Sequence, residues 1–157
     1  MGMINHNNEL TTQLLNHLTM SVIDTNIIIY LTDTIQPYEP LSRLIFEMIE
    51  AGSVSAVLSI ISVAEVMKGP LNKGYHRNAP DVRNYLLNFP NTYCQETTID
   101  VIEHIGRSNL IDWSKLRTID SLIIASGLEN GVELFISNDV HFKKAIPRDL
   151  ALSLDAL

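Results

Sequence analysis

The sequence predicts an α/β fold in which a central, mostly parallel sheet is flanked by helices. Short apolar segments alternate with segments of helical periodicity along the chain, a pattern typical of α/β proteins. One strand segment, residues 56–59, is apolar up to its last residue, Ser59, as a strand that is buried on both faces should be. At 157 residues the chain is long enough for one domain with a substantial core, and no linker or repeat divides it.

The N-terminal half opens with a strand over residues 20–23, after which a helix starts near Thr25. A second helix is predicted over residues 39–51, and Gly52 is placed to end it as a C-cap. Apolar residues recur along this helix at the spacing that puts them on one face, namely Leu41, Leu44, Ile45, Met48 and Ile49. The second strand, residues 56–59, follows it.

The middle of the chain predicts a helix that starts at residues 61–63 and stops at Gly69-Pro70, because proline disfavours the helix interior. A polar loop over residues 68–78 follows. The remaining predicted elements are a helix from Pro80 to about Asn88, a short strand over 93–95, a helix capped by Thr98 that reaches Gly106, a helix over 119–130 closed by Gly131, a strand over 134–137 and an edge strand over 151–154.

The N-terminal segment is expected to be an extension, residues 1–19, that precedes a domain over residues 20–157. It includes a short predicted helix over residues 10–18. The first residues lack the basic and apolar regions of a secretory signal, and no apolar run is long enough to span a bilayer. The single cysteine, Cys94, cannot form an internal disulfide. We therefore expect a cytoplasmic protein with no membrane association.

Four acidic residues stand where apolar runs meet a helix start or a turn: Asp24, Glu65, Asp120 and Asp139. Ligands of open α/β sheets gather outside the carboxyl ends of the strands, so these side chains are expected at one rim of the sheet. Oxygen ligands without His or Cys favour Mg²⁺ or Mn²⁺ over zinc. Metal-activated water that attacks a phosphodiester is the chemistry that suits such a site.

Each acid taken alone also has an ordinary structural explanation. Asp24 is placed to cap a helix, and Glu65 to face solvent on one. Asp120 lies in the first turn of a helix, where the dipole favours an acid, and Asp139 follows turn residues. The four explanations fail jointly, because each would have to place an acid at the same sheet edge independently.

Four segments resemble PIN domains and are most similar to the VapC-type toxins of prokaryotic toxin–antitoxin modules: residues 22–26, 61–69, 116–125 and 135–142. The resemblance covers about residues 20–145 and implies a PIN-like three-layer fold. It also implies an endoribonuclease that depends on Mg²⁺ or Mn²⁺, is often dimeric and is silenced in toxin modules by a cognate antitoxin. Asp24, Glu65, Asp120 and Asp139 would form the catalytic metal site, oriented by Thr25, Asn26, Ser137 and Asn138.

Residues 1–19 have no counterpart in a minimal PIN domain, and the formal net charge of −7 is unusual for a protein that binds RNA. The charge predicts weak binding by phosphate contacts alone. Lys68 and Arg117 are candidate RNA-binding residues. An ordinary solvated loop is slightly favoured for Lys68, because its segment has only one aromatic residue for base stacking, Tyr75, whereas Arg117 could equally balance the acidic cluster.

The sequence thus predicts a divalent-metal-dependent endoribonuclease, and two alternatives remain open. One is a non-catalytic PIN-like module that binds RNA or protein. The other is a phosphatase with an aspartyl nucleophile, which generally needs a second Asp two residues after the first; Asn26 stands at that position.

Overall fold

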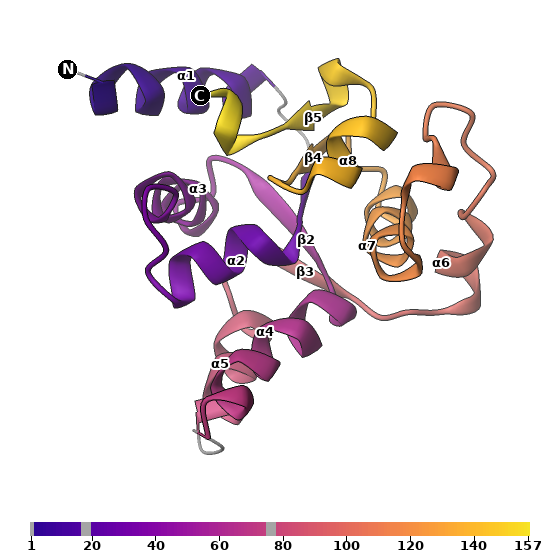
Figure 1. Ribbon diagram of the computed structural model, residues 1–157, viewed down its shortest axis with the longest axis horizontal. Helices are drawn as coiled ribbons and strands as arrows, with labels where there is room; N and C mark the ends of the chain where they lie inside the picture. The colour runs from indigo at the N-terminus through magenta and orange to yellow at the C-terminus, as the bar shows by residue number, and fades with distance from the viewer. Residues whose placement is uncertain (1, 17–19, 75–77) are drawn as a thin grey trace.

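The computed structural model describes residues 2–16, 20–74 and 78–157. Its centre is one sheet of five strands in the order β3-β2-β1-β4-β5, in which every neighbouring pair is parallel (Figure 1). The strands are β1 (Met20–Ile23), β2 (Ser55–Ser59), β3 (Thr92–Gln95), β4 (Leu134–Ile136) and β5 (Ala151–Leu152). The predicted parallel α/β sheet is confirmed.

Eight α-helices are described: α1 (Gly2–Asn16), α2 (Thr25–Thr32), α3 (Glu39–Glu50), α4 (Ile60–Asn72), α5 (Asn78–Leu87), α6 (Ile99–Glu103), α7 (Thr118–Glu129) and α8 (Val140–Ala145). Side-chain oxygens cap four of them at the N-terminus, those of Asp24, Ser59, Thr98 and Asp139. Within the part of the chain described, no helix has both the length and the apolar character needed to cross a membrane.

The sheet separates two layers of helices, as the three-layer prediction requires. Val22, Val57 and Phe135 face α7 and α8 and belong to one apolar cluster with residues of those helices. Residues one step along the same strands, such as Ile23 and Leu58, belong to a second cluster with residues of α1 to α5. Successive strand residues point to opposite faces, so the central strands contribute buried apolar residues to both clusters. Figure 1 shows α7 on one side of the sheet and α2 and α3 on the other.

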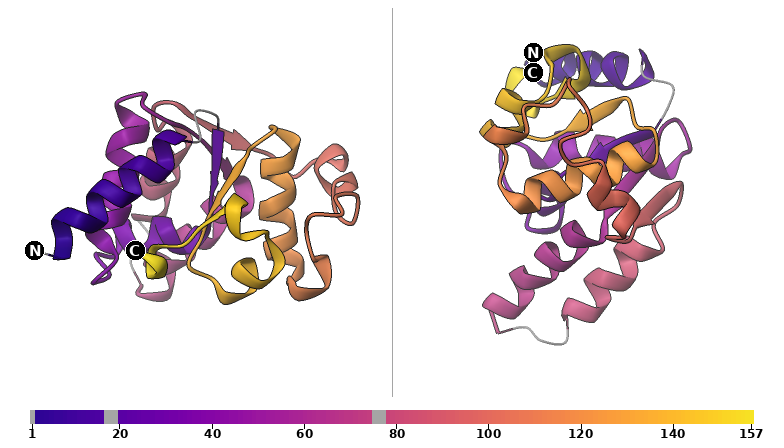
Figure 2. Two further views of the ribbon diagram at one scale, coloured as in Figure 1. Left: turned by 90° about the horizontal axis from the view of Figure 1, so that it is seen from above. Right: turned by 90° about the vertical axis from the view of Figure 1, so that its right-hand side faces the viewer.

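The N-terminal helix α1 is longer than predicted and starts earlier, at Gly2 rather than at residue 10. Leu18, at the end of the predicted helix, lies outside the described residues. Leu10 and Leu14, four residues apart, are 0% and 1% exposed and pack into the same cluster as α3. Figure 2 shows α1 lying across the helical layer that contains α3. The residues just before Leu10 are polar, and Leu10 and Leu14 are the only described side chains of α1 that are buried. The apolar periodicity of the sequence therefore does not predict the first turns of this helix.

The prediction that the helix after β2 stops at Gly69-Pro70 is wrong. Helix α4 includes Pro70 and ends at Asn72, so the first part of the predicted polar loop is helical. The carbonyls of Gly69 and Pro70 accept hydrogen bonds from the Lys73 N–H at 3.3 and 3.2 Å, which closes the last turn. Helix α4 also packs along α5, and this pair projects away from the sheet (Figures 1 and 2). Tertiary packing therefore outweighs the local cost of the proline.

Helix α7 approaches the sheet closely at Gly127. A Cβ added there would lie 2.7 Å from Cγ2 of Val132 and 3.0 Å from Cβ of Val22. We expect Gly127→Ala to lower the free energy of unfolding by about 1–3 kcal/mol in urea denaturation, because the overpacked core must shift. Gly69→Ala is the matched control: its Cβ would meet only Asp33 Oδ2, at 3.9 Å. The control is expected to lose less stability than Gly127→Ala, because its new Cβ meets no core side chain and is opposed only by the ring of the following Pro70; equal effects would contradict the close approach.

Candidate active site

The four acidic residues singled out in the sequence line a single pocket of about 180 Å³. Asp24 follows β1, Glu65 lies on α4, Asp120 on the first turn of α7, and Asp139 between β4 and α8. The other lining residues are Thr25, Asn26, Ile29 and Arg117. The expectation that these acids meet at one rim of the sheet agrees with this geometry.

Asp24 is held at the end of β1 by contacts on both sides. Its Oδ2 accepts a hydrogen bond from the Ser137 hydroxyl at 2.6 Å, and its Oδ1 accepts one from the Thr25 N–H at 2.7 Å. The pKa of the carboxyl is raised from 3.8 to about 6, chiefly by burial and to a smaller extent by the charges of Asp120 and Asp139, although the two hydrogen bonds act in the opposite direction. Asp24 therefore caps α2 and also contributes a costly buried carboxylate to the pocket.

Glu65 is positioned by two hydroxyl groups. The Thr25 Oγ1 donates to Glu65 Oε1 at 2.7 Å and lies 3.0 Å from the Ser62 Oγ. A hydroxyl has one proton to donate, so with Thr25 bonded to Glu65 the fully buried Ser62 donates to Thr25. Sequence reasoning did not identify Ser62, although it lies three residues before Glu65 and thus on the same helical face.

Ser137 ties the strand ends together. Besides donating to Asp24, its Oγ accepts the backbone N–H of Asp139 at 2.9 Å and the Asn26 amide at 3.3 Å. Asp139 Oδ1 in turn accepts the N–H of His141 at 2.7 Å and caps α8. The Ser137 hydroxyl thus fixes the spacing between the first and last acids of the set.

Asn138 connects the pocket to its surroundings. Its backbone N–H reaches Asn26 Oδ1 at 3.4 Å, and its side-chain amide donates to the Tyr30 hydroxyl at 3.3 Å. Its Oδ1 accepts from the Ser153 hydroxyl and the Asp155 N–H, both at 3.1 Å. Asn138 does not line the pocket, but it anchors the turn that carries Asp139.

Arg117 pairs with the acids. Its Nε and Nη2 donate to Asp120 Oδ2 and Oδ1 at 2.8 and 3.3 Å, and its Nη2 lies 3.7 Å from Asp139 Oδ2. The hydrogen bond to Asp120 and its charge raise the pKa of the guanidinium. Of the two readings left open by the sequence, charge balance is the one this contact supports. Lys68 is exposed on α4 and is not among the residues that line the pocket.

The donor chemistry of the pocket fits a hard, hydrated cation. Carboxylate, hydroxyl and amide oxygens surround it. Among the described residues, no three His, Cys, Asp or Glu side chains are close enough to form a ready-made metal site. Mg²⁺ usually keeps several waters and takes only one or two carboxylates directly, so dispersed carboxylates suit it better than they suit a dehydrated zinc ion.

Residues 21–146 match the family model of the PIN domain. The chain belongs to the PIN domain family. A comparison with curated protein sequences gives no match. The predicted PIN-like fold is thereby confirmed for the greater part of the chain, and α1 and residues 147–157 lie outside the matched range.

Solved structures with this PIN fold include VapBC2 from Rickettsia felis bound to a promoter DNA fragment, at a TM-score of 0.59 and 16% identity, covering 86% of this chain and 98% of that one. A toxin–antitoxin complex from Klebsiella pneumoniae matches at a TM-score of 0.59 and 18% sequence identity. The match covers 85% of this chain and 97% of that one. VapC20 from Mycobacterium tuberculosis, described as a sarcin-ricin loop cleaving toxin, matches at a TM-score of 0.59 and 12% sequence identity. The match covers 79% of this chain and 93% of that one. At these identities the likeness establishes the fold.

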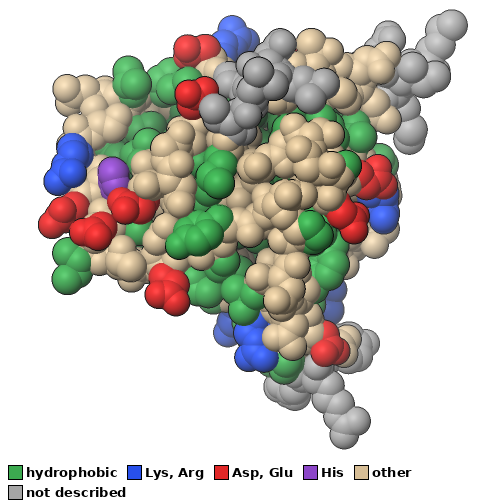
Figure 3. All heavy atoms as spheres, turned by 180° about the vertical axis from the view of Figure 1, so that it is seen from behind, with side chains coloured by type: hydrophobic (Ala, Val, Ile, Leu, Met, Phe, Trp, Pro, Cys, Tyr) green, Lys and Arg blue, Asp and Glu red, His purple; other side chains and the backbone are tan. Residues whose placement is uncertain are grey.

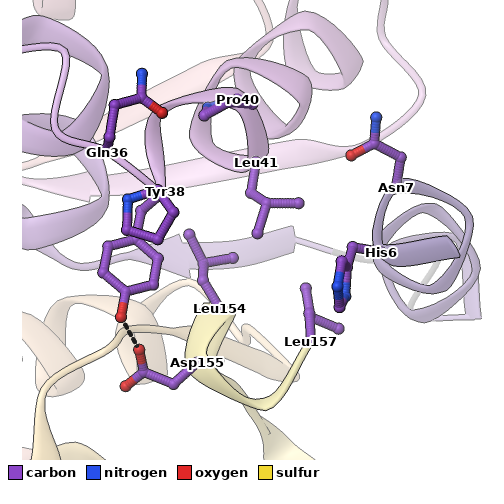
Figure 4. A pocket seen from close by; sticks show the side chains of 10 residues that line it. His6, Asn7, Gln36, Tyr38, Pro40, Leu41, Leu154, Asp155 and Leu157 are labelled. Carbon is purple, nitrogen blue, oxygen red and sulfur yellow. Dashed lines mark hydrogen bonds between the residues drawn. The ribbon is translucent and has the colours of Figure 1, made fainter. Parts of the chain in front are cut away.

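A second hollow, of about 360 Å³, lies between α1, the segment before α3 and the C-terminal residues (Figure 4). Leu41, Leu154 and Leu157 form much of its wall. Its carboxylate, Asp155, accepts hydrogen bonds from the Tyr38 hydroxyl and from Lys143 Nζ. This mainly apolar hollow has one engaged acid and lacks the clustered carboxylates that make the acidic pocket the candidate active site.

Proposed function

We propose that this PIN domain is an endoribonuclease that depends on Mg²⁺ or Mn²⁺. The observation that carries the proposal is that four carboxylates from separate elements line one small pocket. Burial raises the pKa of Asp24, with smaller contributions from the charges of Asp120 and Asp139, and a buried acid with a shifted pKa in a pocket is typical of a functional site.

Asp24, Glu65, Asp120 and Asp139 would hold the ion directly or through water. A bound divalent ion supplies an activated water and stabilises the charge that builds up on the phosphate. Ser137 keeps Asp24 and Asp139 at a fixed spacing, and Thr25 keeps Glu65 turned toward the pocket. Asn26 and Asn138 brace the turn between β4 and α8. A preformed arrangement of this kind lowers the reorganisation needed in the transition state.

RNA is the proposed substrate, and a toxin–antitoxin module is the proposed setting. The structural likeness to VapBC proteins and to VapC20 supports both. We further propose a cognate antitoxin, a homodimer and a cytoplasmic location, with residues 20–157 as the nuclease domain and 1–19 as its extension. On the face seen in Figure 3, basic and acidic side chains are interspersed. RNA selection is proposed to depend on the shape of the site and a few cations such as Arg117, which lines the pocket, with Lys68 as a further candidate.

Incubation of the purified protein with structured RNA tests the proposal. We expect cleavage with Mn²⁺ or Mg²⁺, none with EDTA, and recovery when the ion is added back in excess. A small phosphomonoester, assayed in parallel, should not be hydrolysed. Cleavage that persists in EDTA would remove the metal from the proposal, and hydrolysis of the monoester alone would favour the phosphatase.

The alternative is a non-catalytic PIN-like module that binds RNA or protein. The absence of three converging ligands among the described residues is the observation that favours it. RNA binding without cleavage under every metal condition, by a protein shown to be folded, would establish this alternative in place of the nuclease.

A further inference from the structure

Arg117 is the one cationic side chain among the residues that line the acidic pocket. Its guanidinium meets Asp120 through two nitrogens, at 2.8 and 3.3 Å, and reaches Asp139 at 3.7 Å. This bidentate geometry matches the two oxygens of a carboxylate, so the contact fixes the orientation of the two groups as well as attracting them. One positive charge thus lies against two of the four acids, bonded to Asp120 and close to Asp139.

The two partners differ sharply in exposure. The Arg117 side chain is 68% exposed, whereas that of Asp120 is 5% exposed. The arginine therefore reaches in from solvent, and withdrawing it would neither open a cavity in the core nor leave a buried donor without a partner. The Asp120 carboxylate has no such freedom and must be compensated by some cation when it is ionised.

The guanidinium lies against oxygens that a metal ion would use. Asp120 presents both of its oxygens to Arg117, and Asp139 Oδ2 lies 3.7 Å from the same group. A divalent ion entering the pocket meets a positive charge beside the oxygens that it needs. Binding of the ion and the Arg117–Asp120 contact therefore compete for the same acceptors.

We propose that Arg117 is a latch that occupies Asp120 and Asp139 in the ion-free protein and withdraws when a divalent ion binds. The withdrawn guanidinium stands at the pocket mouth, where a phosphate of the RNA is the next anion that it can bind. Arg117 is thus a positioning residue that couples metal loading to substrate binding. The inference rests on the proposed metal site, but it concerns metal affinity and can be tested without RNA.

Titration of the protein with Mn²⁺ by calorimetry, in low salt and without RNA, tests the latch. Arg117→Gln is expected to bind Mn²⁺ about 3- to 10-fold more tightly than wild type, since one partly exposed ion-pair network no longer competes. Arg107→Gln is the matched control: it removes the same charge from an exposed arginine that pairs with Glu103 on α6. The control is expected to bind Mn²⁺ as wild type does, which removes the effect of net charge from the comparison.

Arg117→Lys keeps the positive charge but loses the bidentate contact with Asp120, so its Mn²⁺ affinity should lie between those of wild type and Arg117→Gln. Circular dichroism of each variant verifies the fold. Weaker or unchanged Mn²⁺ binding by Arg117→Gln, relative to Arg107→Gln, would overturn the latch and show that Arg117 preorganises the carboxylates. Tighter binding by Arg117→Gln together with no RNA cleavage by wild type would support the latch and reject the nuclease.

Discussion

Asp24→Asn is expected to lower the rate of RNA cleavage at least about 100-fold while leaving the fold intact. The substitution removes a charge from the centre of the acidic pocket but keeps the size of the side chain. Asp24 is 5% exposed and fixed by Ser137 and Thr25, so no neighbouring carboxylate can move into its place. Single-turnover cleavage with saturating Mn²⁺ measures the effect on the chemical step.

Asp81→Asn is the matched control for this loss. Asp81 is exposed on α5 and lies outside the lining of the pocket. The control should cleave RNA at the wild-type rate, and circular dichroism should show both variants folded. Full activity of Asp24→Asn would remove Asp24 from the catalytic site.

Although Asp24→Asn is expected to lower activity, it should raise the stability of the protein in EDTA. The folded state raises the pKa of Asp24 from 3.8 to about 6, so it favours the protonated carboxyl. That contribution is fully present below pH 3.8 and is lost as the pH rises through 6. At pH 7, Asp24→Asn should therefore be more stable than wild type by up to about 3 kcal/mol in urea denaturation. The difference should vanish near pH 4; a difference independent of pH would mean that ionisation of Asp24 is not its cause.

The second large effect is expected in the N-terminal helix, where Leu10→Ala or Leu14→Ala should each lower the free energy of unfolding by about 2–5 kcal/mol. Both side chains are almost fully buried in the cluster that also contains α3 residues. Truncation removes apolar contacts and leaves a cavity that the surrounding helices cannot fill. Urea denaturation with a two-state fit measures the loss.

Leu110→Ala provides the comparison, because Leu110 is 64% exposed and its truncation should change stability by less than about 0.5 kcal/mol. If Leu14→Ala changed the free energy of unfolding as little as Leu110→Ala, α1 would not contribute to the stability of the fold. A large loss would make the proposed extension, residues 1–19, part of the folding unit of the nuclease domain.

Much of the fold followed from local properties of the chain. The strand β1 has the bounds predicted for it, and Thr98 and Gly131 lie at helix ends as expected, because apolar runs, caps and glycine turns act over a few residues. The prediction failed where distant contacts decide. Pro70 is tolerated because α4 packs on α5, and α1 is held in place because two of its leucines reach the apolar cluster that it shares with α3.

The candidate site divides in the same way. The sequence by itself singled out the four acids, because each is marked by its immediate neighbours: three follow a strand or begin a helix, and Glu65 lies in the second turn of α4. Only the tertiary structure decided how they are held: Ser137 bonds to Asp24 across 113 positions of sequence, and Thr25 bonds to Glu65 across 40. Only the tertiary structure shows that Arg117 pairs with Asp120 and approaches Asp139. The strength of such contacts depends on distance and burial, which the local sequence does not encode.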